Sequence, residues 1–321
     1  MKKIVLCFPL TGQQVQQIRE ATPGFEVVDA GQEKIATEIL DADIFCGHAK
    51  VPVPWDQVVQ LGKLQWIQSS AAGLDHCLTP EVIQSGIRVT SASGLFADQV
   101  AEQTFALLFG LFRKIPTFLA AMRKKEFIRR PTWDFHGKTV GIIGFGGNGR
   151  RLAELIAPFG NRILATDAFP VNRPDYVEQL LPADQLHRVL SESDVVILCV
   201  PLVEATRQLL DRNALEVMKE GSVLINVARG RVVDEAALVG HLKTGRIAAA
   251  GLDVTEEEPL PESSELWNLE NVLITPHVGA QSARRVPVTV DFFCKNVANY
   301  LQGRPLQNEV DKTLGFPRPA I

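Results

Sequence analysis

The chain has 321 residues, of which 46% are hydrophobic and 22% are charged, a balance typical of globular proteins and too apolar for a disordered one. This length suggests about two domains. A net charge of −4 gives no electrostatic reason to expect nucleic acid or an anionic membrane as a partner.

The five cysteines are scattered and form no C-x-x-C pair, which favours a reducing compartment, so we expect the protein in the cytoplasm. No apolar stretch is long enough for a transmembrane helix, and the opening MKKIVLCF is too short for a signal peptide and predicts a strand. The six histidines are isolated, so no metal site is expected.

In the first hundred residues, short apolar runs alternate with segments of helix length. This alternation predicts a parallel sheet covered by helices on both faces, without a glycine-rich nucleotide motif. The expected strands are Lys3–Phe8, Phe25–Val28, Asp43–Cys46, Gln65–Gln68 and Arg88–Thr90. The expected helices are Gln13–Ala21, Gln32–Leu40, Trp55–Leu61 and Thr79–Ser85.

One loop of this region, Ser69–His76, follows a predicted strand and is rich in small residues. Such a loop can bring bare backbone N–H groups up to a small anion. Equally, it can be a strand-to-helix turn with Asp75 as the cap residue. The residues alone leave both interpretations open.

A long apolar segment, Leu95–Phe112, predicts a helix that leaves the first domain and enters the second. Its apolar residues exceed one helical face, so we expect burial on several sides, including a subunit interface.

The stretch Thr139–Leu152 contains a glycine-rich turn. Val140–Ile143 is a β-branched run typical of a buried parallel strand, Gly144, Gly146 and Gly149 follow in G-x-G-x-x-G spacing, and Arg150–Ala157 predicts a helix. Gly144 permits the turn, Gly146 lets a phosphate approach the backbone, and Gly149 lets helix and strand pack closely. The helix N-terminus then faces the anion, so the stretch predicts a site for a dinucleotide pyrophosphate.

The next strand, Arg162–Asp167, ends in an acid about 20 residues beyond the glycines, where a carboxylate accepts hydrogen bonds from a ribose. An acid there repels a 2′-phosphate, which favours NAD over NADP.

Further strands are expected at Asp194–Cys199, Ser222–Asn226, Ile247–Asp253 and Val272–Thr275, with helices at Asp211–Lys219, Asp234–Thr244 and Gln281–Gln302. The expected fold is α/β, with two doubly wound parallel sheets: a Rossmann dinucleotide domain over residues 97–284, and a smaller flavodoxin-like substrate domain from residues 1–96 and 285–321.

Three of these strands are followed by residues that can do chemistry. Arg229 follows the strand at 222–226, the acids Glu256–Glu258 follow the strand at 247–253, and His277 follows the strand at 272–275. Ligands of open α/β sheets bind at the carboxyl ends of the strands, so these residues should converge there.

Their chemistry fits reduction of a carbonyl group. A guanidinium can hold an α-keto carboxylate, an imidazole can exchange a proton near neutral pH, and a neighbouring acid favours the protonated imidazole. Taken singly, Arg229 fits a surface ion pair, the acids a solvated turn and His277 a turn residue.

These blocks make the sequence similar to the D-isomer-specific 2-hydroxyacid dehydrogenase family, from about Gln65 to Asn308 and most closely between Lys138 and Gly279. The similar blocks are GIIGFGGNG before Asp167, LCVPLVEATR at Leu198–Arg207, NVARGRVVDE at Asn226–Glu235, GLDVTEEEPL at Gly251–Leu260 and TPHVGA at Thr275–Ala280.

The resemblance implies that Arg229, Glu258 and His277 form the catalytic set and that Ala72 and Gly73 donate backbone hydrogen bonds to the substrate carboxylate alongside Arg229. It implies an NAD site that includes Asp253 as a contact to the nicotinamide carboxamide, and a homodimer built on the larger domain. The cofactor contacts implied are Gly144, Gly146, Gly147, Asn148, Gly149, Asp167, Val100, Cys199, Val200, Pro201, Val227, Ala228, Asp253 and Gly279.

The sequence departs from the family pattern at Asn148, where an aliphatic residue is usual, and at Gly147, where arginine is frequent. The expected activity is hydride transfer between NAD and a small 2-oxo or D-2-hydroxy acid, like that of glyoxylate or hydroxypyruvate reductases. The alternatives are a dinucleotide-sensing protein like the corepressors that share this fold, and a phosphite-type dehydrogenase.

Overall fold

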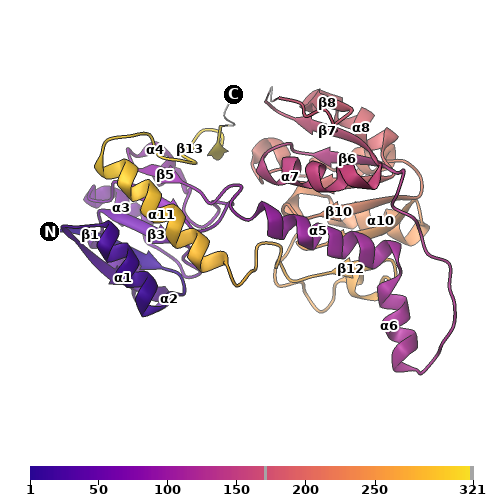
Figure 1. Cartoon of the computed structure of the whole chain (residues 1–321), viewed down its shortest axis with the longest axis horizontal. Helices are drawn as coiled ribbons and strands as arrows, with labels where there is room; N and C mark the ends of the chain where they lie inside the picture. Colours follow the sequence, from indigo (N-terminus) through magenta and orange to yellow (C-terminus); the bar gives the residue numbers. More distant parts are fainter. Residues whose placement is uncertain (170–171, 319–321) are drawn as a thin grey trace. The chain divides into compact units, whose positions relative to one another are not determined.

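A computed structural model describes residues 1–169 and 172–318 of the chain. The chain divides into two compact units, each with its own parallel sheet. The first contains Met1–Phe96 together with the segment from Ser282 onward, and the second contains Ala97–Gln281 (Figure 1).

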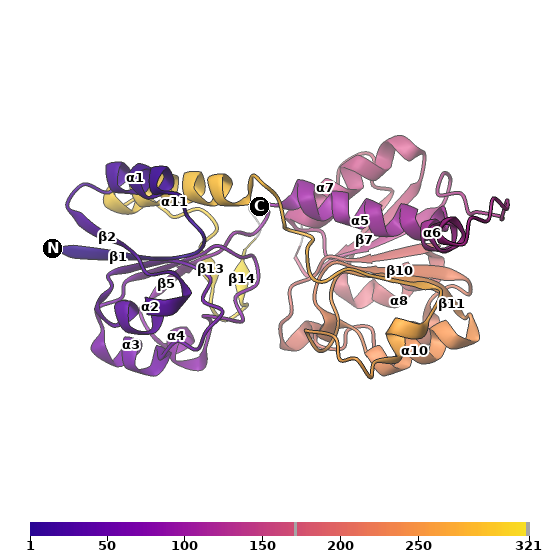
Figure 2. The same ribbon diagram turned by 90° about the horizontal axis from the view of Figure 1, so that it is seen from below.

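The sheet of the first unit has five strands in the order β2-β1-β3-β4-β5, and all neighbouring pairs are parallel. Helices α1 and α11 cover one face, and α2, α3 and α4 cover the other (Figure 2). The elements are β1 (Lys2–Cys7), α1 (Gly12–Ala21), β2 (Phe25–Asp29), α2 (Gly31–Glu38), η1 (Ile39–Asp41), β3 (Ile44–Gly47), α3 (Trp55–Leu61), β4 (Trp66–Ser69), α4 (Pro80–Gln84), β5 (Arg88–Thr90), α11 (Arg285–Leu301), β13 (Val310–Asp311) and β14 (Phe316–Pro317).

Strand β1 shows why a continuous apolar run suits the centre of this sheet. Its side chains alternate between the faces, so Ile4 and Leu6 enter the core under α1 and α11, while Val5 and Cys7 enter the core on the opposite face. A strand buried on both faces has no position for a polar side chain, which explains the run IVLC.

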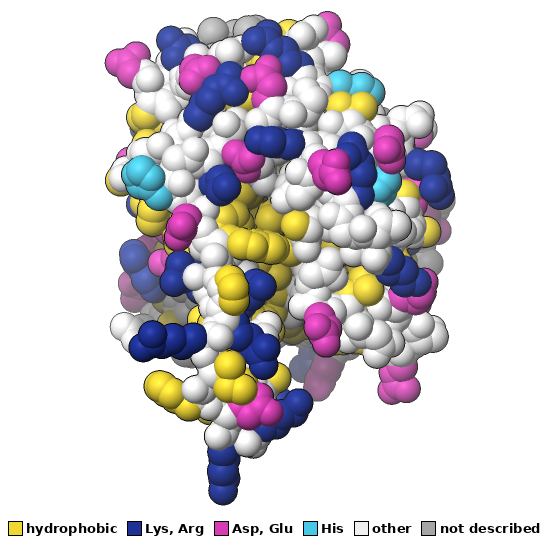
Figure 3. Space-filling model, turned by 90° about the vertical axis from the view of Figure 1, so that its right-hand side faces the viewer, with side chains coloured by type: hydrophobic (Ala, Val, Ile, Leu, Met, Phe, Trp, Pro, Cys, Tyr) yellow, Lys and Arg dark blue, Asp and Glu magenta, His cyan; other side chains and the backbone are white. Residues whose placement is uncertain are grey.

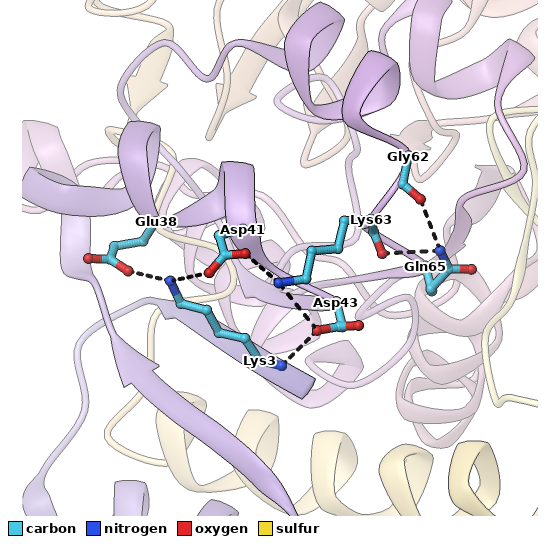
Figure 4. Close-up of polar contacts among 7 residues, drawn as sticks. All are labelled: Lys3, Glu38, Asp41, Asp43, Gly62, Lys63 and Gln65. Atoms are coloured by element: carbon cyan, nitrogen blue, oxygen red, sulfur yellow. Dashed lines mark hydrogen bonds and ion pairs between the residues drawn. The ribbon is translucent and has the colours of Figure 1, made fainter. Parts of the chain in front are cut away.

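The amino-terminal end of this sheet is held by charge pairs (Figure 4). The Lys3 ammonium lies 2.6 Å from Glu38, and the Lys3 amide donates to the Asp43 carboxylate at 2.7 Å. Lys63 pairs with Asp41 and Asp43. Burial alone would lower the pKa of Lys3, but the hydrogen bond and charge of Glu38, with Asp41, outweigh it and raise that pKa. Lys3 therefore stays charged. These charge pairs lie at the amino-terminal end of the sheet, and the loops that follow the strands lie at the opposite end.

The second unit contains a seven-stranded parallel sheet in the order β12-β11-β10-β9-β6-β7-β8. Chain order reverses between β6 and β9, which is the switch point where α/β sheets of this kind bind ligands. The elements are α5 (Ala97–Phe112), α6 (Ile115–Arg123), β6 (Thr139–Ile143), α7 (Gly147–Ile156), η2 (Ala157–Phe159), β7 (Arg162–Asp167), β8 (Gln179–Pro182), η3 (Ala183–Gln185), α8 (Leu186–Glu192), β9 (Val195–Leu198), η4 (Glu204–Thr206), α9 (Arg212–Val217), β10 (Ser222–Asn226), η5 (Gly230–Val232), α10 (Glu235–Thr244), β11 (Ile247–Leu252), η6 (Glu265–Asn268) and β12 (Val272–Ile274).

Two apolar clusters lie on the two faces of this sheet. On one face, α5 and α7 bury Leu107, Leu111 and Leu152 against the strands. On the other, α8, α9 and α10 contribute buried residues such as Val189 and Leu238. The unit is therefore a three-layer doubly wound domain, and with the first unit it confirms the predicted α/β fold class.

Helices α5 and α6 are the most apolar pair of the chain. Within residues 1–169 and 172–318, no single helix is both long and apolar enough to cross a membrane. Only α5 and α6 taken together reach that length and composition, and they are bent by 64° at the break between them. The buried face of α5 is part of the core of the second unit.

Several sequence predictions need correction. The helix expected at Arg150–Ala157 begins at Gly147, because the helical turn starts directly after Gly146. Helix α6 and the short edge strand β8 were not expected, and α4 begins at Pro80 with Thr79 as its N-cap residue, so Asp75 is not its cap. Other boundaries of the predicted elements differ by a few residues.

Candidate active site

The glycine-rich turn connects β6 to α7, and its three glycines have different surroundings. Gly144 has a φ of +95°, a conformation that favours glycine. A Cβ on Gly149 would lie 2.1 Å from the Gly144 carbonyl oxygen, so only glycine lets α7 pack this closely on the turn. At Gly146, by contrast, an added Cβ would meet no atom within 4 Å.

The turn therefore fits a dinucleotide pyrophosphate. Open space lies beside Gly146, which is the N-cap residue of α7, and the first turn of α7 contains Gly147 and Asn148. The amides at a helix N-terminus have no partner within the helix, so they can donate to phosphate oxygens.

Asp167 lies at the carboxyl end of β7, next to this turn. One of its carboxylate oxygens accepts a hydrogen bond from the Phe145 amide at 2.7 Å, and the other accepts one from the Phe169 amide at 2.9 Å. These bonds fix the carboxylate at the sheet edge, while its other lone pairs can accept hydrogen bonds from ribose hydroxyl groups.

Other predicted cofactor residues lie at neighbouring strand ends. Val200 follows β9 and lies against the turn, since a Cβ on Gly144 would come within 2.9 Å of a Val200 methyl group. Burial raises the pKa of the Cys199 thiol to about 12, which favours the protonated thiol at neutral pH. Pro201 follows the same strand, Val227 and Ala228 follow β10, and Val100 lies on α5.

Glu258 and His277 come together although 18 residues separate them in sequence. The His277 Nδ1 atom lies 2.7 Å from a Glu258 carboxylate oxygen. Burial would raise the pKa of Glu258, but the hydrogen bond and charge of His277, the Thr255 amide and the charge of Arg229 together lower it. The carboxylate is thus the acceptor, Nδ1 donates to it, and Nε2 remains for a substrate.

Arg229 lies in the loop after β10, and its charge contributes to the low pKa of Glu258. Asn226 shapes this loop: its side chain accepts a hydrogen bond from the Ala228 amide and donates one to the Arg229 carbonyl, both at 3.0 Å. Gly230 then permits direct contact with the acidic turn, because a Cβ there would lie 1.8 Å from the Thr255 carbonyl oxygen.

Asp253 organises the turn that contains His277. Its side chain is buried, with 2% exposure, and its two oxygens accept hydrogen bonds from the Thr275 hydroxyl and from the Val278 and Gly279 amides at 2.7–2.9 Å. The Gln103 side chain of α5 donates to the same Thr275 hydroxyl at 2.8 Å.

The positioning roles of Asn226, Gly230 and Gln103 were not predicted from the sequence. The N-x-x-R-G spacing carried a signal for the first two, since an asparagine and a glycine flank the arginine. Gln103 gave no such signal because its partner lies far away in the chain.

Ala72 and Gly73 lie in the first unit, in the loop after β4. The Ser69 hydroxyl accepts a hydrogen bond from the Ala71 amide at 3.0 Å, which starts the turn. Within the described part of the chain, the amides of Ala72 and Gly73 donate no hydrogen bond, so they can serve an anion. The set of Arg229, Glu258 and His277 lies in the second unit.

Among the residues that the structure describes, no group of three or more histidine, cysteine or acidic side chains is arranged to hold a metal ion. The arrangement at the sheet edge offers a guanidinium, an imidazole and a carboxylate in contact with that imidazole. This set can bind a carboxylate and move a proton to or from an adjacent oxygen.

Comparison with known proteins gives one consistent result. Residues 105–279 match the family described as D-isomer specific 2-hydroxyacid dehydrogenase, NAD binding domain. A glyoxylate reductase of Pyrococcus horikoshii is 38% identical over 296 residues, which cover 87% of each chain.

Two solved structures resemble the fold over nearly the whole chain. A D-isomer specific 2-hydroxyacid dehydrogenase family protein of Aeromonas salmonicida has a TM-score of 0.85 at 27% identity, covering 97% of this chain and 99% of that one. An enzyme of Xanthobacter autotrophicus, solved with NADPH and MES, has a TM-score of 0.83 at 27% identity, covering 98% of this chain and 100% of that one. The glycine-rich turn, the converging strand-end residues and these matches show that the chain belongs to the D-isomer-specific 2-hydroxyacid dehydrogenase family.

Proposed function

We propose that this protein interconverts a small 2-oxo acid and the D-2-hydroxy acid, using NAD. The observation that supports this most directly is the 2.7 Å contact between Glu258 and His277 beside Arg229, in the same unit as the dinucleotide turn. A nicotinamide dinucleotide is the cofactor of this family, and the open space at Gly146 fits its pyrophosphate.

In the reductive direction, Arg229 binds the substrate carboxylate and draws electron density from the neighbouring carbonyl group. The bound cofactor supplies the hydride that the carbonyl carbon accepts. His277 donates a proton from Nε2 to the carbonyl oxygen, while Glu258 holds the ring through Nδ1. In the oxidative direction, the neutral imidazole takes the proton back.

The Ser69–His76 loop of the first unit is by itself suited to a carboxylate. The amides of Ala72 and Gly73 are the proposed donors, since backbone N–H groups in a loop of small residues can surround an anion. Asp253 and Gly279 are proposed to lie beside the nicotinamide part of the cofactor. Asp253 acts there chiefly by holding the turn that contains His277 and Gly279.

NAD is proposed over NADP because of Asp167. A fixed carboxylate at the end of β7 accepts hydrogen bonds from ribose hydroxyls and repels a 2′-phosphate. Initial rates with NADH and with NADPH at matched concentrations test this proposal. A higher kcat/KM with NADPH would contradict it.

The reaction is tested by NADH oxidation with glyoxylate, hydroxypyruvate, pyruvate and longer 2-oxo acids, and by NAD reduction with phosphite. We expect turnover with at least one small 2-oxo acid, as the relative named glyoxylate reductase indicates. Turnover with phosphite alone, or binding of a partner protein without any turnover, would refute the proposed reaction.

We further propose a homodimer built on the second unit. Helix α6 and the segment after it expose large apolar side chains: Leu119 is 47% exposed, Met122 64%, Phe127 104% and Ile128 54%. Apolar and cationic side chains gather on the projection at the bottom of Figure 3. Such a patch is typical of a subunit interface.

The unpaired cysteines support the proposed cytoplasmic location.

A further inference from the structure

Glu235 lies outside the proposed catalytic set, yet its carboxylate binds the turn that contains Glu258. Glu235 is the first residue of α10, directly after the N-cap residue Asp234. One of its carboxylate oxygens accepts a hydrogen bond from the Glu256 amide at 2.8 Å. Glu256 is only two residues before Glu258, so this bond fixes the backbone immediately ahead of the partner of His277.

The acidic turn also has an internal support at Thr255. The Thr255 hydroxyl donates to the Glu257 carbonyl at 2.8 Å, and the Thr255 amide lies 3.3 Å from the Glu258 carboxylate. These bonds shape the turn, but they do not attach it to its surroundings. The Glu235 carboxylate provides such an attachment from α10.

The segment from Arg229 to Glu235 therefore meets the acidic turn at two points. Gly230 packs directly against the Thr255 carbonyl, and Glu235 binds the next amide along the chain. The same short segment begins with Arg229. The segment 229–235 thus contains Arg229 itself and, through the Glu256 amide, also helps to position the Glu258 carboxylate that contacts His277.

This position is electrostatically unfavourable for a carboxylate. Burial raises the pKa of Glu235, the Glu256 amide opposes that shift, and the nearby charges of Glu256 and Glu257 raise the pKa further. An acid in the first turn of a helix is stabilised by the helix dipole. Glu235 could therefore serve only the stability of α10, and the experiment must distinguish that role from a role in the reaction.

We propose that Glu235 is a positioning residue of the reaction: by holding the Glu256 amide, it keeps Glu258 oriented toward His277. This inference rests on the proposed dehydrogenase function. It adds a fourth side chain to the proposed machinery, acting through Glu258 and not on the substrate.

The variants Glu235→Ala and Glu235→Gln separate the two explanations, with Glu257→Gln as the matched control for loss of one acid from the same turn. We expect Glu235→Ala to lower kcat by about tenfold or more, part of the roughly 10²–10⁴-fold that general acid catalysis contributes. KM for the 2-oxo acid and the Kd for NADH should stay within about twofold, because a positioning residue touches neither ligand.

Glu235→Gln keeps an oxygen acceptor for the Glu256 amide, so it should retain most of kcat, and Glu257→Gln should match the wild type. A helix-dipole role predicts instead that Glu235→Gln loses as much stability as Glu235→Ala while kcat of the folded enzyme stays normal. Wild-type kcat and pH profile in Glu235→Ala would overturn the proposal, and so would an activity loss explained by unfolding measured on the same samples.

A second readout does not depend on turnover. The NMR signals of the His277 ring, in protein with histidine labelled with ¹⁵N, should shift in Glu235→Ala because the partner of Nδ1 moves, and should remain unchanged in Glu257→Gln. Unchanged His277 signals in Glu235→Ala would overturn the positioning role. A wild-type enzyme without turnover on any acid would refute the proposed function alone.

Discussion

The Glu258–His277 pair is the proposed site of proton transfer. Each is partly exposed, the imidazole 45% and the carboxyl group 38%, so solvent weakens their attraction without removing it. The hydrogen bond and charge of the imidazole help to lower the pKa of Glu258, against the effect of burial.

Removing the carboxylate charge should therefore slow the reaction. Glu258→Gln replaces the charged partner of His277 Nδ1 with a neutral one, so we expect kcat of the proposed reaction to fall by about tenfold or more, while the Kd for NADH stays within about twofold. Initial rates and a fluorescence titration with NADH measure the two quantities.

In the wild type the lowered pKa keeps Glu258 ionised below the usual carboxyl range near pH 4. The stability that the pair provides is therefore present at neutral pH and is lost only as pH falls through that lowered value. A kcat in Glu258→Gln equal to that of the wild type would contradict this role of the carboxylate.

At this scale the sequence could predict which side chains converge, because the carboxyl ends of parallel strands meet at one edge. It could not predict the roles of Gly230 and Gln103, or the three hydrogen bonds with which Asp253 holds the His277 turn. Those contacts depend on distances between segments, and a sequence pattern contains none.

The connection between β6 and α7 is the element on which the proposed cofactor binding depends. Gly149 and Gly146 have different surroundings: one faces the Gly144 carbonyl, and the other faces open space. The motif in the sequence already predicted packing for Gly149 and the phosphate approach for Gly146. The structure supports the packing role of Gly149, and phosphate binding at Gly146 stays a proposal.

Two alanine variants should separate these roles. Gly149→Ala places a Cβ 2.1 Å from a carbonyl oxygen and should destabilise the fold by about 1–3 kcal/mol, as overpacking does. Gly146→Ala meets no atom, so it should cost less than about 1 kcal/mol at this N-cap position. It should nevertheless weaken NADH binding by roughly tenfold or more, about 1.4 kcal/mol, because the methyl group occupies the phosphate approach.

Urea unfolding and NADH fluorescence titration measure the two quantities on the same proteins. Equal loss of stability in both variants, or unchanged NADH affinity in Gly146→Ala, would be inconsistent with the separate roles.

Elements that the sequence did not reveal are short or lie at the periphery. Strand β8 has four residues, lies at the sheet edge and ends in Pro182, so it lacks the apolar run of a central strand. Helix α6 has only Ala121 buried, and its cationic end resembled a solvated terminus in sequence. Long central elements such as α5 were predicted because their burial leaves a strong apolar signal.

At the scale of the whole molecule, both units are doubly wound, with strand orders that each contain a switch point. Helix α11 belongs to the first unit although it lies near the end of the sequence, because Val290, Phe293 and Val297 pack in its core. The α/β class followed from the alternation of strands and helices, which is a global property of the sequence.

The proposed dimer can be tested at the segment after α6. Phe127→Asp should shift sedimentation equilibrium from dimer toward monomer, because it places a charge within an apolar interface. Leu61→Asp changes an apolar side chain that is 60% exposed in the first unit and should leave the dimer intact. A monomeric wild type, or a dimer unaffected by Phe127→Asp, would refute this interface.

The central claim is that the set of Arg229, Glu258 and His277 transfers the proton that accompanies hydride transfer. Its most direct test is His277→Ala, assayed for NADH oxidation with the best 2-oxo acid and, separately, for NADH binding by fluorescence. We expect turnover to fall by at least about 10²-fold, since the proton donor is lost, with the Kd for NADH within about twofold. Turnover close to that of the wild type, or a loss of NADH affinity as large as the loss of turnover, would contradict this account.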